Sequence, residues 1–127
     1  ELYYNIGARD LEDAVVPLLR RTGLGLVAFS PLAAGKMAPE RTAEAGAALG
    51  ELLATVDRIA AELGAGRAQV CIAWVLAHPE VTSVLAGAES VGHVEENVAG
   101  TQLVLPSQAL AALDAASDAF RQAGGEV

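Results

Sequence analysis

Short apolar runs alternate along the chain with segments in which apolar residues recur every three or four positions. The runs at 2–5, 24–29 and 81–86 are typical of strands, because they are short and rich in branched and aromatic residues. Helical spacing appears at about 11–22, 49–63, 67–77 and 91–99 and again after Ser107. Strands that alternate with helices pair in parallel. We therefore predict three parallel strands, adjacent in chain order.

The helix ends carry residues with known end preferences. Asp10 and Ser107 are expected N-caps, because a short polar side chain can accept a hydrogen bond from a free amide of the first turn. Gly23 and Gly64 follow the last periodic apolar residues, where glycine readily adopts the left-handed backbone that ends a helix. Pro17 lies inside the first helix and is expected to kink it or to remove one hydrogen bond.

The run at 24–29 is the centre of the predicted sheet. It contains no polar side chain, which is typical of a strand buried on both faces. Pro31 stops the strand, since proline cannot donate to a ladder, and a loop of small residues follows. Ligands of parallel α/β folds bind where strands end and loops begin. Phe29 and Ser30 therefore offer an aromatic face and a hydroxyl to a ligand.

The order of elements predicts an α/β fold that is only part of a barrel. A closed barrel of this kind needs about eight strands and about 250 residues, whereas the chain has 127 residues. It begins close to a strand and without Met, so we expect a piece of a longer protein or a trimmed product. Residues 31–47 lack periodicity and are expected to form a loop, and order is expected to end at 124–125.

The composition indicates a globular protein and argues against some kinds of partner. Hydrophobic residues make up 53% of the chain, as in a globular domain. A formal charge of −8 without a basic stripe argues against nucleic acid. No apolar run reaches about 18 residues, so no membrane span is expected. The single cysteine, Cys71, excludes an internal disulfide, and no secretion signal is evident, so we expect a reducing, cytoplasmic location.

A second candidate site follows the third predicted strand. The segment 87–90, Gly-Ala-Glu-Ser, precedes a helix whose free amides and dipole favour an anion. Gly87 permits close approach of the backbone to a ligand. A small phosphorylated ligand is thus compatible with the acidic chain. His78 and His93 stand far apart without matching cysteine or carboxylate spacing, so no metal site is expected.

Two segments together resemble the last part of an aldo-keto reductase. They are VAFSPLAAG at 27–35 and VLAGAESVGHVEENV at 84–98, and the likeness extends from Tyr3 to about residue 119. Tyr4 and Asn5 are similar to the family's YN pair at the end of the sixth barrel strand, although Tyr4 can equally be core packing. The resemblance implies a partial (β/α)8 barrel with strands six to eight and about five helices. The whole chain is then an incomplete domain.

By this resemblance, the central strand holds the reactive end of an NADP or NAD cofactor. Phe29 takes the place of the aromatic residue that stacks on the nicotinamide ring, and Ser30 and Leu32 match positions that hold the pyrophosphate. Phe29 can instead be a core aromatic. Lys36, the only lysine, can meet a phosphate, but a solvated loop charge is the simpler interpretation.

The same resemblance places the adenosine end of the cofactor after the third strand. Glu96 and Asn97 match a pair that contacts adenine and supports its pocket, and His93 matches a position beside the adenosine. All three can also be ordinary helix surface. The residues implied at this end are Gly87, Ala88, Glu89, Ser90, His93, Glu96 and Asn97.

The chain departs from the family pattern in two ways. Glu89 stands where many members carry Arg, Lys or Ser, and an acid repels a 2′-phosphate, so the choice between NADP and NAD stays open. The family's catalytic Asp, Tyr, Lys and His lie on earlier strands. Tyr3, Tyr4, Lys36 and His78 do not match those motifs, so no catalytic residue is assigned.

Two functional interpretations follow. In the first, the chain is the cofactor-binding part of an NAD(P)-dependent aldo-keto reductase that reduces carbonyls, without the catalytic residues. In the second, it is a non-catalytic nucleotide-binding or self-associating half barrel. A half barrel leaves two strand edges and apolar helix faces open, so self-association or pairing with the rest of a barrel is expected.

Overall fold

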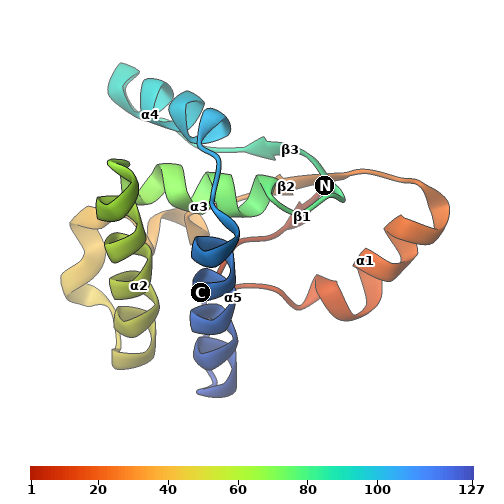
Figure 1. The fold of residues 1–127 in the computed structure, drawn as a ribbon, viewed down its shortest axis with the longest axis horizontal. Helices are drawn as coiled ribbons and strands as arrows, with labels where there is room; N and C mark the ends of the chain where they lie inside the picture. Colours follow the sequence, from red (N-terminus) through yellow and green to blue (C-terminus); the bar gives the residue numbers. More distant parts are fainter.

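A parallel three-stranded sheet organises the fold (Figure 1). The computed structural model describes all 127 residues apart from the side chain of Glu44. The strands are β1 (Leu2–Tyr3), β2 (Leu26–Phe29) and β3 (Val81–Leu85), in the order β1-β2-β3. Both pairs are parallel, as predicted. The strands are shorter than the apolar runs, because β1 ends at Tyr3 and β2 begins only at Leu26.

The described chain has five α-helices in addition to the sheet. They are α1 (Leu11–Thr22), α2 (Ala47–Leu63), α3 (Arg67–Leu76), α4 (Val91–Gln102) and α5 (Ser107–Gln122). Two short 3-10 helices, η1 (Ala33–Gly35) and η2 (Pro39–Glu44), occupy the segment that we expected to be an irregular loop. In Figure 1, α2 and α5 run side by side and α1 stands apart from the other helices.

The observed helix ends confirm that Gly23 and Gly64 end their helices, but they show that neither Asp10 nor Ser107 is an N-cap with a capping side chain. Gly23 and Gly64 adopt left-handed backbones, with φ of 69° and 63°, directly after α1 and α2. Asp10 itself has a helical backbone, and its side chain makes no capping hydrogen bond. Ser107 is the first residue of α5 rather than its cap, because the preceding Pro106 holds the extended conformation at the cap position. The helix α1 continues through Pro17.

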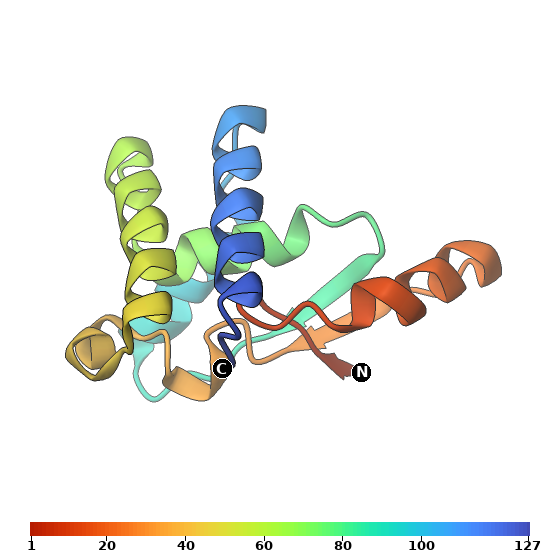
Figure 2. The ribbon, with the colours of Figure 1, turned by 90° about the horizontal axis from the view of Figure 1, so that it is seen from below.

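The sheet is covered on one face, which corrects the expectation that β2 is buried on both. Leu26 and Ala28 are buried, whereas Val27 and Phe29 are only partly buried. Figure 2 shows α3 and α5 on one side of the sheet. Leu85, which pairs with Phe29 in register, is 47% exposed. An unbroken apolar run thus indicated a strand but could not show that only one face is packed by this chain.

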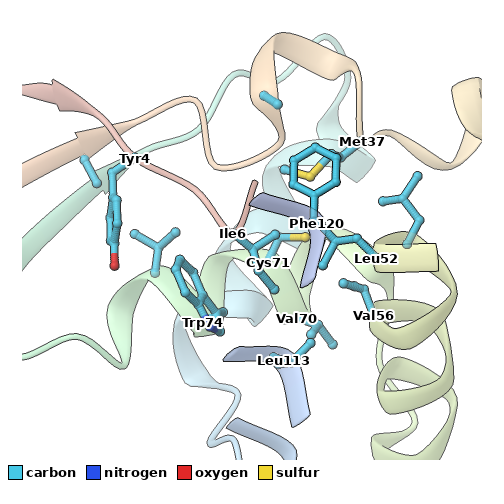
Figure 3. Close-up of a cluster of buried hydrophobic side chains, with 14 of the residues drawn as sticks. Tyr4, Ile6, Met37, Leu52, Val56, Val70, Cys71, Trp74, Leu113 and Phe120 are labelled. Carbon is cyan, nitrogen blue, oxygen red and sulfur yellow. The ribbon is translucent and has the colours of Figure 1, made fainter. Parts of the chain in front are cut away.

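The core lies between the covered face of the sheet and α2, α3 and α5 (Figure 3). Cys71 and Trp74 of α3 are fully buried in it. The chain does not lose its order at Gly124 and Gly125, because Val127 packs against the core. The largest fully buried side chains are Trp74, Tyr4, Ile6, Met37, Leu52, Leu53, Ile59, Ile72, Leu113, Val56, Val70 and Val75.

Two of the core helices bear on the question of a membrane. Among the helices of the described chain, no single one is long and apolar enough to cross a bilayer. By length and composition alone, α2 and α3 together pass that test, with a bend of 96° between them.

A polar network attaches α1 to the rest of the molecule. The Tyr4 hydroxyl donates to Glu12 Oε1 at 2.6 Å, and Arg9 donates to both carboxylate oxygens of Glu12 at 2.8 Å. Arg9 also donates to Asp118 of α5 at 3.1 Å. Burial tends to raise the pKa of Glu12, but the hydrogen bonds from Arg9 and Tyr4 outweigh it, so the pKa lies below its usual value.

Candidate functional site

The loops after β2 and β3 leave the sheet at the same edge. These strands are parallel neighbours, and Phe29 at the end of β2 pairs in register with Leu85 at the end of β3. Carboxyl ends of parallel strands form the ligand-binding edge of α/β folds. The two candidate segments of the sequence, 29–32 and 87–90, are therefore brought to one side of the molecule.

Phe29 presents its ring on the face of the sheet that the helices leave open. Side chains alternate along a strand, so Phe29 lies opposite to the buried Ala28 and on the same face as Leu85. Its ring contacts Tyr3 of β1 edge to face, with centroids 5.5 Å apart. Phe29 is thus not a core aromatic of this chain. Tyr3 was missed as its neighbour, although the alternation of Tyr3 with the buried Tyr4 is a signal for it.

The loop after β2 holds an unusual backbone. Ser30, Ala33 and Ala34 have φ of 58°, 51° and 52°, the left-handed region that residues other than glycine seldom adopt. Ser30 is fixed in this conformation from outside the loop, because the buried Asn5 donates through Nδ2 to the Ser30 carbonyl at 3.1 Å. Strain of this kind collects at ligand-binding loops. Sequence reasoning gave Asn5 no role in holding this loop, because Asn5 was counted as part of the predicted strand at 2–5.

Backbone contacts make the rest of this loop compact. The Leu32 carbonyl accepts from Gly35 N at 3.0 Å and from Met37 N at 3.2 Å. Leu32 is partly buried and Lys36 is exposed, so the loop places an exposed cation next to its backbone. Ala33 is buried, whereas Ala34 is exposed and Gly35 is partly buried, so the loop is open to a phosphate around 34–35.

The loop after β3 is held against the beginning of α4. Ser90 Oγ accepts from His93 N at 3.1 Å and so caps the helix. Asn97 donates through Nδ2 to the Gly87 carbonyl at 3.1 Å, and Glu89 N donates to His93 Nδ1 at 3.3 Å. Residues 87–90 are exposed. Asn97 therefore supports the loop from two turns into the helix, and Ser90 is engaged as a cap.

Glu96 points away from the loop after β3 and toward the beginning of α3. Its carboxylate lies against Gly66, at the start of α3, where a side chain in place of the glycine hydrogen would collide with it. The structure thus separates two neighbours in sequence: Asn97 reaches the loop after β3, and Glu96 reaches the beginning of α3. Both are partly buried, unlike His93, which is exposed beside Glu89.

The arrangement has the parts that a nicotinamide dinucleotide needs. It offers an aromatic plane at Phe29, a loop of small residues that is open around 34–35, and a helix, α4, that is capped by Ser90. A mostly apolar cavity of about 250 Å³ lies between β3, α3 and α4, next to Ala88 and Asn97. A larger cavity of about 670 Å³ lies beside Tyr3 and the C-terminal segment.

Two ionisable side chains without an assigned role, Tyr4 and His78, do not face the open side of the sheet. Tyr4 and His78 meet, with ring centroids 5.3 Å apart, but Tyr4 lies on the covered face. Burial is the main cause that raises the pKa of Tyr4, and the hydrogen bond to Glu12 adds to it. Among the described side chains, no group of three His, Cys, Asp or Glu residues is placed to hold a metal ion.

Comparison with known sequences decides the family. The sequence model of the Aldo/keto reductase family matches residues 1–118. The chain belongs to the aldo-keto reductase family. Pyridoxine 4-dehydrogenase of Escherichia coli (strain K12) is 33% identical over 114 residues, which cover 90% of this chain and 35% of that enzyme. Methylglyoxal reductase YeaE of the same organism is 32% identical over 118 residues, which cover 91% and 38%.

The structural comparison agrees with this assignment. The chain superimposes on the crystal structure of a thermostable aldo-keto reductase, solved with the inhibitor epalrestat, with a TM-score of 0.71 and 31% identity. The match covers 90% of this chain and 38% of that one. The three parallel strands and their helices are thus a segment of an aldo-keto reductase barrel, and the chain spans well under half the length of these relatives.

Proposed function

We propose that the chain is the cofactor-binding part of an NAD(P)-dependent aldo-keto reductase that reduces carbonyl compounds. The observation that carries this proposal is the position of segments 29–32 and 87–90, which follow adjacent parallel strands at one edge of the sheet. Membership of the family makes a nicotinamide cofactor the natural ligand for that edge. The methylglyoxal reductase among the relatives supports a carbonyl substrate.

The chain's own residues divide the work of binding. Phe29 orients the nicotinamide ring by stacking on it, and the Ser30 and Leu32 backbone receives the pyrophosphate. The adenosine end lies along Gly87, Ala88, Glu89 and Ser90, with His93, Glu96 and Asn97 around the base. When bound, the cofactor supplies the hydride for reduction. The single buried Cys71 fits a reducing compartment, so we place the protein in the cytoplasm.

We further propose that this chain supplies no general acid. In the family that group is a Tyr on an earlier barrel strand. Here Tyr4 donates to Glu12 on the covered face, and Tyr3 packs on Phe29. A turnover assay with a reactive aldehyde and either cofactor should therefore show no reduction by the purified chain. Cofactor-dependent turnover that persists through purification would contradict this part of the proposal.

Cofactor titration tests the binding role. NADPH and NADH fluorescence is measured on adding the protein in the longest form that its gene encodes, with the parent and with Phe29→Ala. Loss of one stacking ring should weaken binding about tenfold, because aromatic stacking on a base or ring contributes roughly 1–3 kcal/mol. Val104→Ala, at a side chain that is 83% exposed, is the control and should bind as the parent does. Equal affinity of Phe29→Ala and Val104→Ala would exclude stacking on Phe29.

A second function is favoured by the open edges of the sheet. Only one edge of β1 and one of β3 is paired in the described structure, and Leu85, Val94 and Val98 are 47%, 50% and 53% exposed next to β3. A half barrel with such a surface can associate with a second copy. Sedimentation of the isolated chain distinguishes a self-associating half barrel from a monomeric binding domain, because self-association gives a molecular mass that rises with protein concentration.

A further inference from the structure

Arg67, at the start of α3, lies outside the candidate binding segments 29–32 and 87–97. Only 6% of the residue is exposed, and charged residues are seldom buried to this extent unless they are fully paired. Its guanidinium donates to both carboxylate oxygens of Asp57 on α2, through Nε at 2.7 Å and Nη2 at 2.6 Å. The fork of the guanidinium is thereby fixed in direction.

The remaining nitrogen of this fork reaches the loop after β2. Arg67 Nη1 donates to the Met37 carbonyl at 3.2 Å, and Met37 N donates to the Leu32 carbonyl at 3.2 Å. The Met37 side chain is fully buried in the core. Asp57, Arg67, Met37 and Leu32 thus form one continuous chain of hydrogen bonds from α2 to the candidate phosphate loop.

This loop needs support from outside itself. Ala33 and Ala34, between Leu32 and Met37, adopt left-handed backbones that cost free energy for a residue with a side chain. Asn5 holds the loop at Ser30, its first residue. The contact from Arg67 holds the other end, so that the backbone between the two clamps has one geometry.

We propose that Arg67 is a positioning residue for cofactor binding, which sets the backbone at 32–37 through the Met37 carbonyl. The inference rests on the proposed cofactor function and deepens it. A buried ion pair adds little net stability on average, because desolvation offsets the attraction. The Arg67 guanidinium joins α2, α3 and the loop after β2. Its main effect is therefore to fix the geometry of that loop rather than to add stability.

Arg67→Met tests this inference against Arg58→Met. Arg58 follows Asp57 on α2. It pairs with Glu62 at 2.6 Å, and both of these side chains are more than half exposed. Arg67→Met should weaken NADPH and NADH binding about tenfold, which corresponds to about 1.4 kcal/mol, because the loop loses a hydrogen bond from a charged group. Adenosine 5′-monophosphate, which reaches only the loop after β3, should bind as tightly as to the parent. Arg58→Met should change neither affinity.

Arg67→Lys separates positioning from stability. A lysine keeps the charge beside Asp57 but cannot hold Asp57 and the Met37 carbonyl together, because it lacks the planar fork. It should recover the melting temperature lost in Arg67→Met without recovering cofactor affinity. If Arg67→Met does not fold, Asp57→Asn weakens the same fork and should raise the cofactor Kd in the same direction by a smaller factor.

Hydrogen exchange gives a readout that does not depend on the cofactor. Amides at 33–38 should exchange faster in Arg67→Met, and not in Arg58→Met. Unchanged exchange there would overturn the inference, as would equal losses of NADPH and adenosine 5′-monophosphate affinity, which indicate general destabilisation. Failure of the parent itself to bind either nicotinamide cofactor would instead contradict the proposed function, and the exchange data would still decide whether Arg67 sets the loop.

Discussion

Glu89 brings a negative charge to the loop after β3. Its side chain is exposed, and its backbone N–H donates to His93 Nδ1 at 3.3 Å. An acid at the ribose of a dinucleotide can accept a hydrogen bond from a 2′-hydroxyl and repels a 2′-phosphate. If the adenosine lies where we propose, this residue therefore favours NAD over NADP.

Glu89→Arg should shift the ratio of NAD to NADP affinity toward NADP by about tenfold or more, because like charges at close range cost roughly 1–3 kcal/mol. Both cofactors are titrated against the parent and the variant. Glu95→Arg makes the same change of charge on an exposed position of α4, beyond its first turn, and should leave the ratio nearly unchanged. An unaltered ratio in Glu89→Arg would show that this side chain faces solvent and that preference is set elsewhere.

Single residues were predictable where the chemistry is local. Phe29 and Ser30 could be placed at the end of a strand because Pro31 stops it. The clamps on the loop were not predictable, because Asn5 and Arg67 reach it across 25 and 30 positions of sequence. Periodicity contains no information about such distant contacts.

At the scale of elements, α3 and α4 pack closely at Gly100. This glycine is buried in α4, and a β-carbon there would lie 3.0 Å from Gln69 Cα and 3.1 Å from Ile72 Cβ. A main-chain atom cannot yield as the end of a side chain can. The glycine thus sets how near α4 comes to α3, and with it where the loop after β3 is held.

Gly100→Ala should destabilise the fold by about 1–3 kcal/mol, as overpacking does in well-packed cores. Gly92→Ala is the matched control in the same helix, because its β-carbon would meet only Ser90 Oγ, at 3.7 Å. There the higher helix propensity of alanine should stabilise by up to about 1 kcal/mol. Urea unfolding of both variants measures the difference, and changes of the same sign would show that α3 and α4 are not in close contact at Gly100.

The attachment of α1 should depend on pH through Glu12. The pKa of this carboxyl is lowered in the folded state, so its contribution to stability is present at neutral pH and is lost as the pH falls through the folded pKa. Glu12→Gln should cost about 1–3 kcal/mol at pH 7 and much less near pH 3. Urea unfolding at both values checks this. Glu62→Gln removes an exposed carboxylate and should cost less than about 1 kcal/mol at either pH.

The elements themselves were largely predictable, and the errors have physical causes. The parallel order and the glycine ends follow from local preferences. The burial of β2 on both faces was wrong, because helices of this chain pack on only one face of the sheet, and an apolar run does not show which faces are covered. The 3-10 turns at 33–44 were missed because short helices leave no periodic pattern.

For the molecule as a whole, three strands of a barrel form an ordered unit with a packed outer layer. The helices α2, α3 and α5 build the core on one side, while Phe29 and Leu85 lie on the side that the helices leave open. Family membership and the TM-score of 0.71 identify the unit as a barrel segment. We propose that the carboxyl edge of this unit, from Phe29 to Asn97, is a nicotinamide dinucleotide site.

A crystal structure of the protein with NADPH or NADH, in the longest form that its gene encodes, tests this claim most directly. We predict the nicotinamide ring against Phe29, the phosphates beside Ser30 and Leu32, and the adenosine between residues 87–90 and Asn97. A cofactor bound elsewhere, or no cofactor at this edge at saturating concentration, would contradict the account.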